Sequence, residues 1–82
     1  MQIERKNLIG NSVRIARERS RPKLTQDGLA VRLQLLGWTD CDRFTVSKIE
    51  LGTRRVTDFE VKLLSKALNV SADWLLRPQD DN

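Results

Sequence analysis

The chain has 82 residues, enough for one small domain, and its fifteen Lys and Arg outnumber eleven Asp and Glu, for a net charge of +4. One Cys and no His exclude an internal disulfide and argue against a zinc site or a histidine-based catalyst. No apolar run is long enough for a signal peptide or a membrane span. We therefore expect a soluble, cytoplasmic protein without a cofactor or a membrane, and the basic charge favours a polyanionic partner.

Apolar residues recur at helical spacing, which predicts five short helices and an all-α fold. The first helix is expected from about Leu8 to Ser20. Four later starts follow from one repeated pattern: an apolar residue, then a capping residue, then a second apolar residue five positions after the first. This pattern predicts that helices begin after Thr25, Asp42, Thr57 and Ser71.

The ends of the helices are also predictable. Gly37, Gly52 and Asn69 lie where a left-handed residue would end the second, third and fourth helices, and Pro78 ends the fifth. Gly28 lies inside the first turn of the second helix, where it should cost about 0.5–1 kcal/mol relative to alanine.

The predicted domain covers residues 8–77, between flexible tails at 1–7 and 78–82. No repeat or low-complexity segment interrupts it.

The predicted third helix has two different faces. Val46 and Ile49 point inward, and at about 100° per residue the opposite face carries Phe44, Ser47, Lys48 and Leu51, with Arg43 on the N-terminal flank. That outer face has no acid, and a turn with two adjacent cations follows it. Such a helix suits a duplex groove, where it can reach base edges while cations hold phosphates. The alternative is an ordinary solvated helix face.

Three segments together resemble the Cro and phage-repressor type of helix-turn-helix domain (the XRE family). They are LTQDGLA at 24–30, FTVSKIELGTRR at 44–55 and KALNVSADWLL at 66–76. The resemblance implies a five-helix, lambda-repressor-like DNA-binding domain whose second and third helices form the helix-turn-helix, with the third helix in the major groove. Residues 33–41 exceed the usual spacing, so an extended second helix and a longer turn are expected.

Position by position, the resemblance implies contacts with double-stranded DNA. The base-reading residues would be Arg43, Phe44, Thr45, Ser47 and Lys48, and the backbone-binding residues Thr25, Gln26, Arg54 and Arg55. Arg14 and Lys23 are further backbone candidates, or else free solvated cations. Gln26 would touch a phosphate or an adjacent side chain, and Phe44 would either pack on a thymine methyl or fold back onto Trp38 or the turn. Arg17 matches a family position that pairs with the equivalent of Glu50, which implies a structural ion pair.

Four apolar residues are candidates for a subunit or partner interface: Leu35, Leu36, Trp38 and Trp74. Trp38 could instead make a local contact with Leu33 at the end of the second helix, and Trp74 could belong to the core. Cys41 is most simply explained as an apolar residue at the start of the third helix.

The sequence thus predicts a DNA-binding transcriptional regulator, not an enzyme. A repressor that acts as a homodimer at the nucleoid is expected. The alternative is a protein-interaction module on the same fold, of an antitoxin-like or regulatory kind.

Overall fold

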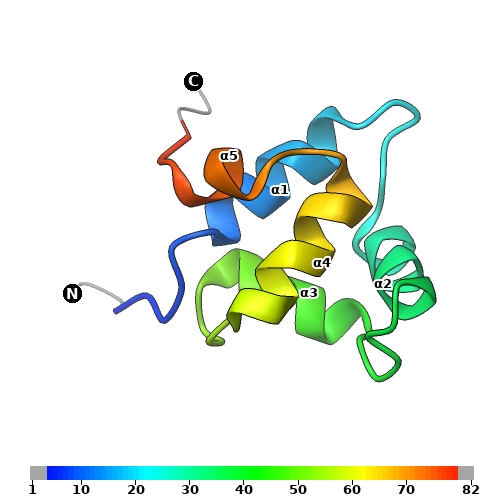
Figure 1. The fold of residues 1–82 in the computed structure, drawn as a ribbon, viewed down its shortest axis with the longest axis horizontal. Coiled ribbons are helices and arrows are strands. Elements are labelled where there is room, and N and C mark those ends of the chain that lie inside the picture. Colours follow the sequence, from blue (N-terminus) through cyan, green and yellow to red (C-terminus); the bar gives the residue numbers. More distant parts are fainter. Residues whose placement is uncertain (1–3, 80–82) are drawn as a thin grey trace.

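The computed structural model describes residues 4–79, so residues 1–3 and 80–82 of the two predicted tails lie outside the described residues. Between residues 4 and 79 the chain forms five helices and no strand (Figure 1). They are α1 (Gly10–Arg19), α2 (Gln26–Leu35), α3 (Arg43–Leu51), α4 (Asp58–Leu68) and α5 (Ala72–Leu76). The predicted all-α, five-helix fold is confirmed.

Each of the four predicted helix starts has the predicted cap. The side chains of Thr25, Asp42, Thr57 and Ser71 accept hydrogen bonds from the backbone N–H three residues further on. At α4 the bond is reciprocal, because the Glu60 carboxylate also accepts from the Thr57 N–H, 3.0 Å away. Each cap satisfies a backbone donor that has no partner inside the helix.

Three helices end in the predicted left-handed residue. The φ angles are 114° at Gly37, 78° at Gly52 and 56° at Asn69. Each end has the same pair of backbone bonds, as at α2, where Gly37 N–H donates to Gln34 and Trp38 N–H to Leu33. Residues 33–41, expected to lengthen the second helix and its turn, form the last residues of α2 and most of the connection 36–42.

The first helix begins at Gly10 and not near Leu8. The side chain of Asn7 caps the backbone just ahead of it. Its Oδ1 accepts hydrogen bonds from the backbone N–H groups of Ile9 and Gly10, at 3.0 and 2.8 Å. Lys6 and Asn7 belong to the predicted tail 1–7, and Lys6 also makes a hydrogen bond to the folded chain, from its backbone N–H to the Gly52 carbonyl. At the other end, the side chain of Gln79 donates to the carbonyl of Trp74.

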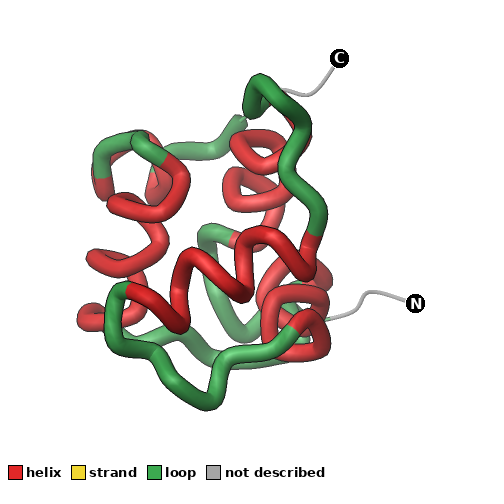
Figure 2. Tube along the Cα trace, turned by 90° about the vertical axis from the view of Figure 1, so that its right-hand side faces the viewer, coloured by secondary structure: helices red, strands yellow, loops and turns green. Residues whose placement is uncertain are grey.

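The helices cross one another around a single core (Figures 1 and 2). Its fully covered side chains come from every helix, and include Val13, Leu29, Ile49, Leu64 and Leu75. α3 packs against α1 and α2, while α5 packs against α1 and α4. None of the helices within residues 4–79 has the length and apolar composition of a membrane span.

Gly10 allows α1 to lie directly on the end of α3. A Cβ atom at this position would overlap the carbonyl oxygen of Ile49 and lie 2.9 Å from that of Glu50. Since both neighbours are backbone atoms, a larger residue would have to separate the two helices. The position of α3 relative to α1 therefore depends on the absence of a side chain at Gly10.

Candidate nucleic-acid interface

The two faces of α3 differ as predicted in their exposure. Val46 and Ile49 are fully buried, whereas Phe44 is 60% and Leu51 64% exposed. Lys48 lies between them on the same exposed stripe. Burial of the inner face fixes the rotation of the helix about its axis, and so determines which side chains reach the solvent.

Arg43 and Phe44 form a pair at the start of α3. The Arg43 guanidinium lies over the Phe44 ring, 5.0 Å from its centre, and an Nη1 of Arg43 is 4.0 Å from a carboxylate oxygen of Asp27 on α2. Phe44 is mostly exposed, and the Arg54 guanidinium lies over the ring of Trp38, 5.2 Å from its centre. An aromatic ring and a cation therefore project together from the N-terminal end of α3.

Thr45 and Ser47, two further candidates for base reading, are less accessible to solvent. Both the backbone N–H and the hydroxyl of Thr45 donate to the same carboxylate oxygen of Asp42, at 2.9 and 3.1 Å. These bonds, the backbone one first, hold the pKa of Asp42 below its ordinary value. Ser47 is half-buried. Thr45 thus strengthens the cap of α3, and Lys48 is the more accessible polar group of the outward face.

Arg17 and Glu50 form a double hydrogen-bonded ion pair between α1 and α3. Nε and Nη2 of Arg17 donate to the two carboxylate oxygens of Glu50, at 2.7 and 3.0 Å. Gln26 at the start of α2 adds a bond to Glu50 of 3.1 Å, so it touches an adjacent side chain, one of the two expected partners. The hydrogen bond to Glu50 raises the pKa of Arg17. The network joins three helices behind the exposed face of α3.

Arg54 has partners within the chain. Its two terminal nitrogens lie 2.9 and 3.1 Å from the carboxylate oxygens of Glu60, and Nη1 also donates to the Arg55 carbonyl. The Glu60 hydrogen bond raises the pKa of Arg54. Burial alone would raise the pKa of Glu60, but hydrogen bonds from Arg54 and Thr57 outweigh it and lower that pKa. A phosphate contact by Arg54 would require it to share or exchange these bonds.

The other predicted backbone-binding cations occupy different surroundings. Arg14 donates to Glu18 and Asn11 on its own helix, at 2.9 and 2.6 Å. Lys23 is exposed in the connection before α2, and Arg55 is exposed after α3. Arg55 is therefore the cation that directly follows the outward face of α3 and remains open to solvent.

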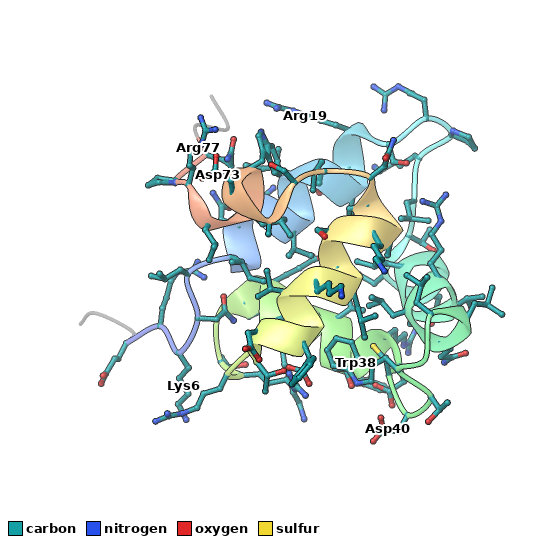
Figure 3. All side chains as sticks on the ribbon, viewed as in Figure 1. Lys6, Arg19, Trp38, Asp40, Asp73 and Arg77 are labelled. Carbon is teal, nitrogen blue, oxygen red and sulfur yellow. The ribbon has the colours of Figure 1, made fainter. Side chains whose placement is uncertain are left out.

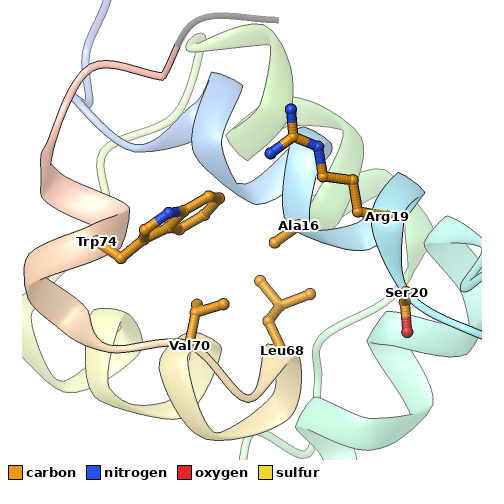
Figure 4. Close-up of a pocket in the computed structure, with 6 residues that line it drawn as sticks. All are labelled: Ala16, Arg19, Ser20, Leu68, Val70 and Trp74. Atoms are coloured by element: carbon orange, nitrogen blue, oxygen red, sulfur yellow. The ribbon is translucent and has the colours of Figure 1, made fainter.

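The four candidate interface residues divide into two kinds. Leu35 and Leu36 are exposed, at 83% and 41%, beside a shallow apolar hollow between α2 and α4. Trp38 and Trp74 are half-buried against the core. Trp74 also lines a hollow of about 300 Å³ over α1 and the end of α4 (Figure 4). The leucines therefore remain surface candidates, while both tryptophans have packing roles.

Cys41 is fully buried beside the start of α3. Burial raises the pKa of its thiol to about 11, so the thiolate that reactions and metal binding require is scarce. Within residues 4–79 no cluster of His, Cys, Asp and Glu could hold a metal ion.

Two features of this region were missed by sequence reasoning. The ion pair of Arg54 with Glu60 was not expected, although Thr57 and Glu60 have the spacing of a capping box, in which the glutamate turns back toward the start of the helix. The anchoring role of Asn7 was also missed. An Asn shortly before a helix is a capping signal, and it could have been recognised.

The order and packing of α2 and α3 define a helix-turn-helix domain of the lambda-repressor-like type. A family model described as Helix-turn-helix matches residues 13–75, most of the chain. The chain therefore belongs to this helix-turn-helix family of Cro/repressor-type domains, a family of DNA-binding regulators. No curated protein and no solved structure shows a significant match.

Proposed function

We propose that the protein is a sequence-specific transcriptional regulator that reads the major groove of double-stranded DNA with α3, and that it acts as a repressor dimer at the nucleoid in the cytoplasm. The outward face of α3 supports this proposal most strongly. It presents Arg43, Phe44 and Lys48 to solvent while the opposite face is fully buried. An α-helix fits the major groove, where base pairs display distinct donors, acceptors and methyl groups.

In this proposal Arg43 and Lys48 read guanine, and Phe44 contacts a thymine methyl group. The interaction of Arg43 with Asp27 is long and exposed, and such pairs contribute little. Arg43 can therefore leave Asp27 for a bidentate contact with guanine, which is worth about 1–3 kcal/mol of discrimination. Thr45 and Ser47 lie beside these residues, and their short side chains would contact the DNA only where it comes close to the helix.

Arg55, Lys23 and Thr25 would hold the phosphates on either side of the groove, with Arg14 as a further candidate, and Gln26 would join them through the amide hydrogen that its bond to Glu50 does not use. Arg54 would act mainly through Glu60 and Trp38, by fixing the turn that carries Arg55. Backbone contacts of this kind set the register of α3 without reading sequence.

Fluorescence anisotropy with labelled duplexes tests the proposal, after a random duplex library has been used to select the preferred site. Lys48→Ala should change which sequences are preferred, whereas Arg55→Ala should weaken binding to all duplexes alike. The half-site spacing of the selected site would give the geometry of the dimer. Absence of salt-dependent duplex binding at micromolar protein would refute the proposal.

A second candidate function is recognition of a protein partner through Leu35 and Leu36. Their exposure beside the apolar hollow between α2 and α4 favours it. Leu35→Ser should abolish binding of a partner at this surface, and Lys48→Ala should leave it unchanged. For duplex binding we expect the reverse: Lys48→Ala should alter it and Leu35→Ser should leave it unchanged. The two functions are compatible if a partner controls access to DNA.

A further inference from the structure

The segment ahead of α1 is attached to the C-terminal end of α3 by the side chain of Asn7. Its amide nitrogen donates to the carbonyls of Ile49 and Arg54, at 3.1 and 2.8 Å, while its oxygen accepts from the backbone N–H groups of Ile9 and Gly10 where α1 begins. The amide uses both its donors and its acceptor. Residues far apart in sequence are thereby fixed side by side.

The residues before Asn7 continue along the same surface. The backbone N–H of Lys6 donates to the carbonyl of Gly52, at 2.8 Å. The side chain of Arg5 lies across Gly52, where an added Cβ would be 2.5 Å from a guanidinium nitrogen and 3.1 Å from Cγ. Gly52 thus provides both the left-handed turn and the space for Arg5.

Arg5, Lys6 and Arg55 line a polar hollow of about 460 Å³ together with Glu4. All four side chains are exposed. Three cations and one acid give the hollow a net charge of +2 (3 − 1). No apolar side chain lines it, so it suits a hydrated anionic group and not an apolar ligand.

The hollow lies at the C-terminal end of α3, which on its own would repel a phosphate. The C-terminal end of a helix carries a partial negative charge of about −0.5, and the net charge of +2 in the hollow outweighs it. The exposed stripe Phe44, Lys48 and Leu51 leads directly to this end of the helix. An α-helix with its side chains is about 10–12 Å across, which matches the major-groove width of about 12 Å, so a helix seated in the groove lies between two phosphate strands. A phosphate strand can therefore lie at the end of α3 when its outward face is in the groove.

We propose that Arg5 and Lys6 join Arg55 in a phosphate-binding site for the DNA backbone at the C-terminal end of α3. The site is formed by a segment that precedes the helix-turn-helix in sequence and lies outside the family match at residues 13–75. It rests on the proposed function, because its ligand is the phosphodiester backbone of the duplex that α3 reads.

The test compares the salt dependence of duplex binding among single variants of the whole chain. For Lys6→Gln and Arg5→Gln we expect the slope of log K against log salt to become shallower by about 0.9 for each phosphate that the variant no longer neutralises. At 0.1 M salt this corresponds to a decrease of roughly eight-fold in affinity, equal for all sequences. Glu4→Gln should strengthen binding. Lys6→Gln is the cleaner variant, because it leaves the backbone bond to Gly52 intact.

Arg19→Gln is the charge-matched control, since Arg19 lies at the end of α1 far from Lys6 (Figure 3). Its slope should equal that of the wild type. An unchanged slope in Lys6→Gln, or an equal change in Arg19→Gln, would overturn the inference while leaving the proposed function in place. A wild-type chain without salt-dependent binding would instead refute both. Thermal midpoints of unfolding distinguish a third outcome. If Arg5→Gln lowers the midpoint and leaves the salt slope of duplex binding unchanged, Arg5 stabilises the end of α3 and does not bind phosphate.

Discussion

At the scale of single residues, Gly10 sets the distance between two helices. Its neighbours across the contact are the carbonyl oxygens of Ile49 and Glu50, which belong to the backbone of α3 and cannot turn aside. Gly28 differs, because an added Cβ would meet the flexible end of the Leu24 side chain at 2.9 Å. The two glycines form a natural pair for comparison.

Gly10→Ala should lower the free energy of unfolding by about 1–3 kcal/mol, since the new methyl group has to push α1 away from α3. Gly28→Ala should leave it unchanged or raise it by up to about 1 kcal/mol, because alanine is the better helix former. Urea unfolding followed by circular dichroism measures both. Equal effects of the two substitutions would contradict the contact described for Gly10.

Among the helices, the ion pair of Arg17 and Glu50 joins α1 to α3, and Gln26 extends it to α2. The two charged side chains are only 11% and 5% exposed. Removal of one partner would leave the other charge covered and without its counter-charge, which is more costly than removal of both.

Arg17→Met should therefore destabilise the domain by about 3 kcal/mol, and the double variant Arg17→Met with Glu50→Leu by less than the sum of the two single effects. A double-mutant cycle in urea measures the coupling. Strictly additive effects would show that the two charges do not interact.

The ion pair of Arg54 and Glu60 joins the end of α3 to the start of α4 and responds to pH. Because the pKa of Glu60 is lowered below its ordinary value of 4.5, the folded state holds the ionised form. Its contribution to stability is present above that pH and is lost as the pH falls through the lower, folded-state pKa.

The thermal midpoint of the wild type should exceed that of Glu60→Gln at neutral pH, and the two should converge as the pH falls below 4.5. Glu18→Gln is the control, because its pair with Arg14 is a more exposed pair within one helix. A difference between wild type and Glu60→Gln that stays constant at acid pH would exclude this role of the carboxylate.

At the scale of the whole molecule, Cys41 reports on global unfolding. Its thiol is fully buried, and burial raises its pKa to about 11. At pH 8 in native buffer, reaction with a disulfide reagent should therefore be far slower than that of a free cysteine. In urea one thiol per chain should react rapidly. Rapid labelling of the native protein would show that the start of α3 opens without unfolding of the domain.

Most of the fold could be predicted because its boundaries depend on local chemistry. Thr57 with Glu60 marks a start, and Gly52 and Asn69 mark ends, through bonds that reach only a few residues along the chain. The partners of Asn7 and Gln26 could not be predicted in the same way, since they lie 42 and 24 positions away for Ile49 and Glu50. Such interactions depend on how the helices cross, which no local pattern specifies.

The attachment of Asn7 to the end of α3 also determines where a probe can be placed on this protein. A fluorophore attached at Glu4, which shares the hollow with Arg55, would lie beside the helix proposed to enter the groove, and its emission should change when a duplex binds. One attached at Gln79, whose side chain donates to the Trp74 carbonyl, would lie beside α5, which packs on α1 and α4. The first position would serve as a binding sensor and the second as a site for immobilisation that leaves the reading helix undisturbed.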